Sequence, residues 1–255
     1  MSFRLYKTWR LIATGLGFSV FGVGVVLLGA YIFLFIYLPP WAKERKQKRV
    51  RQVIHWACGR YVELLHRLGL ITYDYHCTER FLKAPRLIVA NHPSLIDVLI
   101  LLSLVPDASC IIKAEMMRSR IIAGIASLAG YIPNDDASLV ARAMAVLDSG
   151  RSLIVFPEGT RTVPGKKMSL RRGAANIAVR ARCVITPVLI RFDPVALLKE
   201  QRWYDIPDRR IHIVVRAMPA LTIEECIDVA RPMTVQARHL TAFFANYFDT
   251  ELKTL

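Results

Sequence analysis

A histidine and an aspartate lie five positions apart at a predicted strand-to-helix turn. The heptapeptide Asn91-His92-Pro93-Ser94-Leu95-Ile96-Asp97 follows a β-branched apolar run at 86–90, which is typical of a buried strand, and precedes a predicted buried helix over 95–104. Pro93 disfavours the α conformation at His92, so we expect the imidazole to lie in the turn, over the helical turn that carries Asp97. A carboxylate bonded to one imidazole nitrogen fixes the tautomer and leaves the other as a proton acceptor. The pair could therefore act as a general base.

The same heptapeptide has a structural interpretation. A histidine beside a proline can serve packing alone, and Asp97 could be a favourable charge in the first turn of a helix. Ser94 lies too close to His92 in the sequence to serve as a triad nucleophile, and the chain has no G-x-S-x-G elbow. The remaining sequence has to decide between catalysis and structure.

A second stretch with binding chemistry runs from Phe156 to Arg161. The apolar segment 152–156 predicts a strand, and the residues that follow are Pro157, Glu158, Gly159, Thr160 and Arg161. Ligands of α/β sheets bind at the carboxyl ends of strands, and a guanidinium can bind two phosphate oxygens at once. Further positive charge follows at Lys166, Lys167, Arg171 and Arg172. Together these residues predict an anion site.

The charge of +15 is concentrated near the N-terminus. Residues 1–60 contain ten Lys or Arg and one acidic residue, whereas residues 61–255 contain twenty-five against nineteen. This distribution is typical of a protein at a membrane surface, and it disfavours a nucleic-acid binder, which would need a basic face outside the first sixty residues. The five cysteines have neither C-x-x-C nor metal-ligand spacing, so we expect reduced thiols, a cytosolic location and no metal site.

The N-terminal part predicts a membrane anchor. Residues 11–38 carry no charge, and this segment is long enough to cross the bilayer. No small-residue cleavage site follows it. The basic flanks modestly favour a span with the following domain in the cytoplasm, while five glycines leave open a re-entrant hairpin with both ends cytosolic. We expect an anchor at 1–42, an amphipathic helix on anionic lipid at 43–70 and a catalytic domain at 71–255.

Helices and strands alternate in the predicted globular part. The predicted strands are 73–77, 86–90, 108–112, 152–156, 184–191 and 211–216. The predicted helices are 95–104, 116–128, 137–148, 171–181 and 233–253, with an extended loop at 192–210. This alternation predicts an α/β fold with a mixed, mostly parallel sheet flanked by helices. An apolar stripe in the last helix, Leu240, Phe243, Phe244, Tyr247, Phe248 and Leu252, is predicted to face the core.

These motifs resemble the glycerolipid acyltransferase family, which includes the 1-acyl-glycerol-3-phosphate acyltransferases. The resemblance rests on the His-x4-Asp pattern of His92 and Asp97, followed about sixty residues later by Phe-Pro-Glu-Gly-Thr-Arg. Two further blocks are similar to family motifs: Lys113-Ala-Glu115 with Gly124 and Gly130, and Ile185-Thr186-Pro187-Val188. The likeness covers residues 86–191 in order.

The resemblance implies a membrane-bound enzyme on the cytoplasmic face of the inner membrane. His92 would be the base and Asp97 its orienting partner, Lys113 and Arg161 would hold the acceptor phosphate, and Glu158, Gly159 and Thr160 would shape that site. The acyl donor would be acyl-coenzyme A or acyl carrier protein, without a cofactor. The acceptor would be 1-acyl-glycerol-3-phosphate and the product phosphatidate, in phospholipid biosynthesis.

One block departs from the family pattern. Asp135 and Asp136 stand where the family's second motif usually has an arginine, and two carboxylates would repel a phosphate. Either Arg161, Lys113 and Arg142 suffice, or the acceptor is another lysophospholipid or a hydroxyacylated lipid. A catalytically idle lipid-binding protein is the alternative of a different class.

Overall fold

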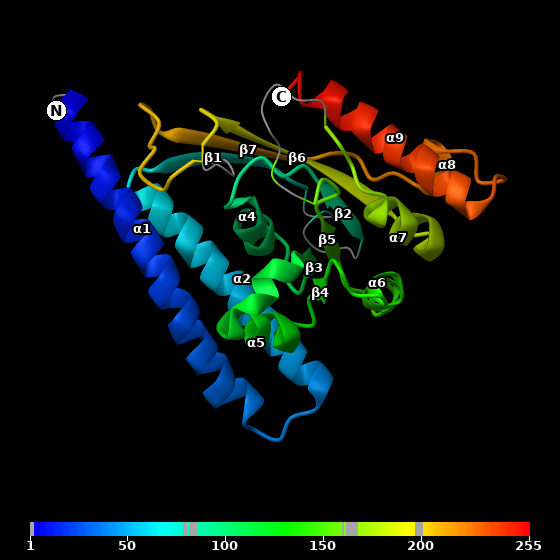
Figure 1. Ribbon diagram of the computed structural model, residues 1–255, viewed down its shortest axis with the longest axis horizontal. Coiled ribbons are helices and arrows are strands. Elements are labelled where there is room, and N and C mark those ends of the chain that lie inside the picture. The colour runs from blue at the N-terminus through cyan, green and yellow to red at the C-terminus, as the bar shows by residue number, and fades with distance from the viewer. Residues whose placement is uncertain (1–2, 79–80, 82–85, 160, 162–167, 197–200) are drawn as a thin grey trace.

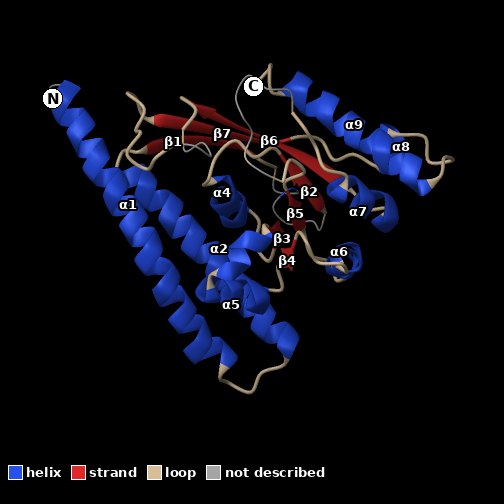
Figure 2. Cartoon of the chain, in the orientation of Figure 1, coloured by secondary structure: helices blue, strands red, loops and turns tan. Residues whose placement is uncertain are grey.

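The computed structural model describes residues 3–78, 81, 86–159, 161, 168–196 and 201–255. In this part of the chain, a seven-stranded sheet has helices on both faces (Figures 1 and 2). Its strands are β1 (Ile71–His76), β2 (Leu87–Ala90), β3 (Ser109–Ile112), β4 (Ile132–Pro133), β5 (Leu153–Val155), β6 (Ile185–Asp193) and β7 (Ile211–Ala217). The order is β1-β7-β6-β2-β5-β3-β4, and β6 pairs with β7 in antiparallel fashion while the other pairs are parallel. The predicted fold class is confirmed.

Two groups of helices cover the two faces of the sheet. The helices are α1 (Phe3–Ile32), the π-helical η1 (Phe33–Tyr37), α2 (Lys43–Arg67), α4 (Asp97–Leu104), the 3-10 helix η2 (Ala114–Arg118), α5 (Arg120–Ala129), α6 (Leu139–Asp148), α7 (Gly173–Ala181), α8 (Ile223–Cys226) and α9 (Met233–Glu251). Helices α1, α2, α4 and α5 cover one face, and α6, α7 and α9 cover the other (Figure 1).

Strand β2 is apolar at every position because both of its faces are buried. Ile88 and Ala90 point into the core beneath α2 and α4, whereas Leu87 and Val89 point into the core beneath α7 and α9. All of these side chains are fully buried, as expected for a central strand with both faces covered. The buried strand therefore fixes the position at which the motif Asn91–Asp97 begins.

The C-terminal stripe faces the core, as predicted. Leu240, Phe244 and Phe248 on α9 are buried in the core beneath α7, while Phe243 and Tyr247 pack at its margin. A side chain truncation in such a core costs about 3–5 kcal/mol for phenylalanine. Helix α9 thus closes the second face of the sheet.

The N-terminal segment is one continuous helix. Residues Tyr6–Tyr37 are long and apolar enough to cross a membrane, but the re-entrant hairpin considered for this segment does not form. The glycines do not bend the chain, and two of them, Gly17 and Gly29, allow close packing. A Cβ added to Gly17 would lie 3.1 Å from Leu65 of α2, and one added to Gly29 would lie 3.1 Å from Ile121 of α5.

Helix α2 runs back along α1 and packs onto the domain. Phe21 of α1 and Tyr61 of α2 have ring centroids 5.3 Å apart, and a short connection at 38–42 joins the two helices (Figure 1). The apolar face of α2, which includes Val50, Ile54 and Val62, is buried against the domain. The predicted amphipathic helix therefore uses its apolar face for protein packing, and its contact with lipid stays a prediction.

The remaining differences from the sequence prediction concern short elements. The helix predicted at 116–128 forms as two pieces, η2 and α5, and the loop predicted from 192 begins only after Asp193 because β6 is longer. Strand β4 and helix α8 were not predicted. Both have four residues or fewer, too few to show a periodic pattern.

Candidate active site

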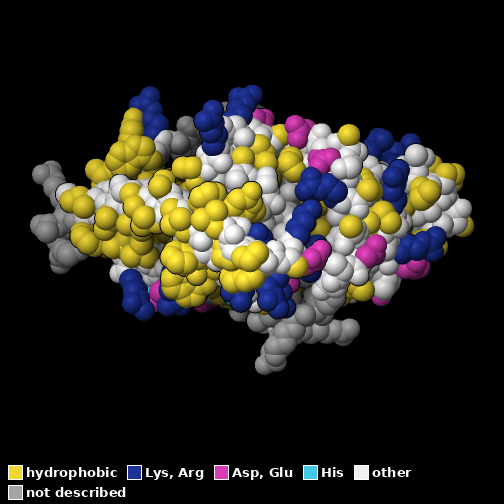
Figure 3. All heavy atoms as spheres, turned by 90° about the horizontal axis from the view of Figure 1, so that it is seen from below, with side chains coloured by type: hydrophobic (Ala, Val, Ile, Leu, Met, Phe, Trp, Pro, Cys, Tyr) yellow, Lys and Arg dark blue, Asp and Glu magenta, His cyan; other side chains and the backbone are white. Residues whose placement is uncertain are grey.

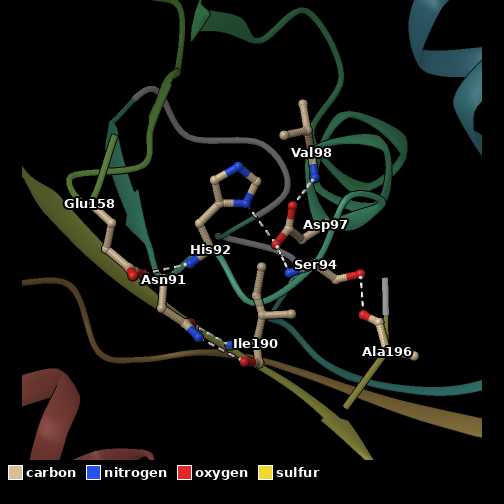
Figure 4. Close-up of polar contacts among 8 residues, drawn as sticks. All are labelled: Asn91, His92, Ser94, Asp97, Val98, Glu158, Ile190 and Ala196. Atoms are coloured by element: carbon tan, nitrogen blue, oxygen red, sulfur yellow. Dashed lines mark hydrogen bonds and ion pairs between the residues drawn. The ribbon is translucent and has the colours of Figure 1, made fainter. Parts of the chain in front are cut away.

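The turn between β2 and α4 positions His92. Helix α4 begins at Asp97, two residues later than predicted, so residues 91–96 lie outside it. The side chain of Asn91 fixes the start of the turn, because its Nδ2 donates to the Ile190 carbonyl at 2.8 Å and its Oδ1 accepts the Ile190 N–H at 2.8 Å (Figure 4). Strand β6 thereby holds the turn that carries His92, a role of Asn91 that the sequence did not predict.

His92 and Asp97 form the predicted dyad. His92 Nδ1 lies 2.9 Å from Asp97 Oδ2, and this oxygen also accepts the Ser94 N–H at 2.9 Å while Oδ1 accepts the Val98 N–H at 2.8 Å. The Asp97 side chain is fully buried and that of His92 is 19% exposed. Because ionised Asp97 can only accept, Nδ1 is the donor and Nε2 is left as the proton acceptor.

The second motif meets the first at the His92 backbone. Glu158, which follows β5, is buried, and its Oε1 accepts the His92 N–H at 2.9 Å (Figure 4). Phe156 packs against the imidazole with ring centroids 4.5 Å apart. We had expected Glu158 to shape a phosphate site. Its described contact fixes the main chain of the candidate base, and its part in a phosphate site stays a prediction.

A large apolar groove opens at the dyad. It has a volume of about 1950 Å³ and passes beneath α1, α2, α4 and α5. Polar side chains that line it near the motifs are those of His92, Lys113, Asn134, Arg161 and Arg171, and Gly159 lines it as well. Lys113 is about half exposed and pairs with Glu115 at 3.2 Å. The structure thus brings the predicted Lys113, Gly159 and Arg161 to one groove with His92, while Thr160 lies outside the described residues.

Asp135 and Asp136 stand where an arginine was expected, and the charge of Asp136 is balanced by a nearby arginine. Asp136 accepts hydrogen bonds from the hydroxyl and the N–H of Ser138 at 2.6 and 2.8 Å, and it pairs with Arg142. The bonds from Ser138, followed by that from Arg142, lower the pKa of Asp136 to about 2. Arg142 also donates to the Tyr131 carbonyl at 3.2 Å and does not line the groove. Its described contacts are thus with Asp136 and the Tyr131 carbonyl, and a role for Arg142 in holding the substrate stays a prediction.

Other nucleophiles near the site are unsuited to covalent chemistry. Ser94 is fully buried and its Oγ donates to the Ala196 carbonyl at 3.2 Å. All five cysteines are free thiols, as predicted. Burial raises the pKa of Cys58 and of Cys110, the latter also close to Asp97, to about 12, so both stay protonated at neutral pH. His92, in contrast, presents Nε2 to the groove as a proton acceptor.

Residues 72–191 match the family model described as Acyltransferase. The mouse 1-acyl-sn-glycerol-3-phosphate acyltransferase alpha is 30% identical over 151 residues, which are 55% of this chain and 51% of the mouse protein. A chloroplastic 1-acyl-sn-glycerol-3-phosphate acyltransferase of Arabidopsis thaliana is 30% identical over 112 residues, 42% of this chain and 32% of that protein. The chain therefore spans between a third and about half of the length of these relatives.

The fold has a solved counterpart. The crystal structure of the 1-acyl-sn-glycerophosphate (LPA) acyltransferase from Thermotoga maritima superposes with a TM-score of 0.69, at 19% identity, over 96% of this chain and 99% of that chain. At this identity the likeness concerns the fold. The family model and the curated relatives concern the sequence, and the matched residues 72–191 contain both the His92–Asp97 dyad and Glu158. Residues 72–191, slightly under half of this chain, are thus similar to the acyltransferase family model, and the relatives are named 1-acyl-sn-glycerol-3-phosphate acyltransferases.

Proposed function

We propose that this protein transfers a fatty acyl group from an acyl thioester to the hydroxyl of a lysolipid, with 1-acyl-glycerol-3-phosphate as acceptor and phosphatidate as product. The observation that carries the proposal is the His92–Asp97 dyad at an apolar groove that also contains Lys113 and Arg161. The names of the relatives support the same acceptor.

The dyad suits a direct transfer. His92 Nε2 takes the proton of the acceptor hydroxyl, and the oxygen attacks the thioester carbonyl. The tetrahedral intermediate then collapses, the carbon–sulfur bond breaks, and the imidazolium returns its proton to the leaving thiolate. Asp97 stabilises the imidazolium through the 2.9 Å contact with Nδ1. General-base catalysis of this kind supplies about 10²–10⁴ in rate, and positioning of the two substrates must supply the rest.

The groove has the chemistry that both substrates need. Apolar side chains from α1, α2, α4 and α5, such as Val98, Leu99 and Ile125, suit an acyl chain. The cations Lys113 and Arg161 suit a phosphate. The pairing of Asp136 with Arg142 reduces the repulsion that two free carboxylates would exert on a phosphate monoester. This favours 1-acyl-glycerol-3-phosphate over the other acceptors considered, whereas acyl-coenzyme A and acyl carrier protein both stay possible donors.

We infer that the protein acts at the cytoplasmic face of the inner membrane. Hydrophobic side chains gather on the side of the molecule where α1 lies (Figure 3), and many large ones on α1, including Val23, Val26 and Leu27, are exposed. Both ends of α1 contact the domain: Arg10 donates to the Pro207 carbonyl at 2.6 Å, and Ile32, the last residue of α1, is buried in the core. A helix held at both ends on one side of the membrane would lie along it and would not cross it.

The first test is transfer of a radiolabelled acyl group by the membrane-bound protein. We would offer 1-acyl-glycerol-3-phosphate beside lysophospholipids with larger head groups and hydroxyacylated lipids. His92→Ala removes the base, and His76→Ala, an exposed histidine at the end of β1, is the matched control. Phosphatidate formed by the natural protein and the control, but not by His92→Ala, supports the proposal. Transfer to another acceptor alone would replace the substrate, and no His92-dependent transfer would leave lipid binding as the function.

A further inference from the structure

Arg171 is held beside the Phe156–Gly159 turn although it is distant in sequence. It lies two residues before α7, and its N–H donates to the Pro157 carbonyl at 2.7 Å. This bond closes the loop that leaves β5 and brings the backbone of Arg171 next to the residues that hold the candidate base. Its neighbour Arg172 has an exposed side chain that does not line the groove.

Gly159 makes room for the Arg171 side chain. Gly159 has φ +65°, and a Cβ added there would lie 2.8 Å from Arg171 Nε and 3.0 Å from Cδ. Any other residue at this position would be strained and would displace the arginine. The absence of a side chain at Gly159 therefore lets Arg171 lie directly on the turn, with its guanidinium at the groove.

The charge of Arg171 is available to a ligand. Arg171 lines the same groove as His92 and Arg161. No carboxylate among the residues that the structure describes forms an ion pair with its side chain. An arginine fork binds two oxygens of a phosphate at once. An anionic ligand would account for the position of Arg171, for its exposure and for the lack of an ion pair within the described part of the chain.

We propose that Arg171 binds a phosphoester of one of the two substrates in the catalytic groove. The phosphoester belongs either to the head group of the acceptor or to the thioester carrier, since both carry the same chemistry. This inference rests on the proposed function, because it concerns the substrates of that reaction. Arg171 thereby becomes a binding residue that the Phe156–Arg161 motif does not contain.

The variants Arg171→Gln and Arg171→Lys test the proposal. The matched control is Arg180→Gln, at an exposed arginine of α7 that does not line the groove. We expect Arg171→Gln to raise the KM of one substrate by roughly tenfold or more, with kcat little changed, since a charge-assisted bond is lost. Arg171→Lys keeps the positive charge and should raise the same KM by less than Arg171→Gln does. A higher KM for 1-acyl-glycerol-3-phosphate identifies the head group, and a higher KM for the acyl thioester identifies the carrier. Arg180→Gln should change neither KM.

A direct binding measurement keeps this inference separate from the proposed function. We would measure the rise in the thermal midpoint of the full-length protein with coenzyme A and with glycerol 3-phosphate, for the natural protein and for Arg171→Gln. Loss of one ligand's stabilisation in the variant supports the proposal even if no acyl transfer is found. Equal KM values and equal stabilisation in the natural protein and in Arg171→Gln would overturn it, while His92-dependent transfer by the natural protein would leave the proposed function intact.

Discussion

Replacing Asp97 by asparagine removes a buried carboxylate that accepts three hydrogen bonds. Oδ2 accepts from His92 Nδ1 and from the Ser94 N–H, and Oδ1 accepts from the Val98 N–H. An asparagine has one acceptor oxygen and one NH₂ group. In either orientation, the NH₂ group faces at least one buried main-chain N–H and leaves it without an acceptor.

The size of both effects follows from this geometry. One buried N–H without an acceptor costs about 1–3 kcal/mol. For a chain of this length, that corresponds to a fall of roughly 2–12 °C in the unfolding midpoint. The imidazole also loses the carboxylate that fixes its tautomer and stabilises its charged form, so we expect kcat to fall by about 10²–10⁴.

The comparison variant is His92→Gln, assayed by acyl transfer and thermal unfolding. It removes the base but leaves Asp97 bonded to the N–H groups of Ser94 and Val98. We therefore expect a similar loss of kcat with a smaller loss of stability than in Asp97→Asn. An Asp97→Asn protein that retains more than about a tenth of the natural kcat would refute the assignment of Asp97 as the orienting partner.

Three further predictions concern residues around the dyad. Glu158→Gln keeps an oxygen that can accept the main-chain N–H of His92, so its kcat should stay within about tenfold of the natural value. Glu158→Ala should lower kcat by about 10²-fold and should also lower the unfolding midpoint. Equal losses in both variants would contradict this role of Glu158. Because hydrogen bonds from Ser138 and Arg142 lower the pKa of Asp136 from 3.8 to about 2, its stabilising contribution is present above about pH 4 and is lost as the pH falls toward 2. The urea midpoints of the natural protein and Asp136→Asn should therefore converge on acidification, and a difference that persists at pH 2 would count against the pairing. Ala57→Phe narrows the groove beneath α1 and should shift the preferred donor toward shorter acyl chains, measured with a series of acyl thioesters, while an unchanged chain-length profile would mean that the chain binds elsewhere.

The sequence predicted the elements whose side chains repeat along the chain. Strand β2 was recognisable because its residues fill two cores and are apolar at every position, and α9 because Leu240, Phe244 and Phe248 recur at helical spacing. The dyad was predictable for a different reason. His92 and Asp97 lie within one turn, so local backbone chemistry around Pro93 was enough to bring them together.

Contacts between distant residues left no such signal. The bond from Asn91 to Ile190 joins residues 99 positions apart, and the packing of Arg171 on Gly159 depends on how the loop after β5 returns. The pairing of Asp136 with Arg142 was equally invisible, which is why two acids beside a phosphate site looked unfavourable. In each case a single side chain decides the geometry, and a single side chain makes no periodic pattern.

The hydrogen bonds between Asn91 and β6 determine when, during synthesis of the chain, the turn that carries His92 can become fixed. A nascent chain that has emerged as far as α6 already contains His92, Asp97 and the strand before them, but it lacks the Ile190 backbone that holds Asn91 and the Ala196 carbonyl that holds Ser94. Such long-range contacts form late, because the intervening chain must first be ordered. We therefore expect the growing polypeptide to have no competent base until β6 has left the ribosome and docked. If the proposed function holds, incomplete chains would be unable to carry out the transfer, and the appearance of activity would report that the central sheet is complete.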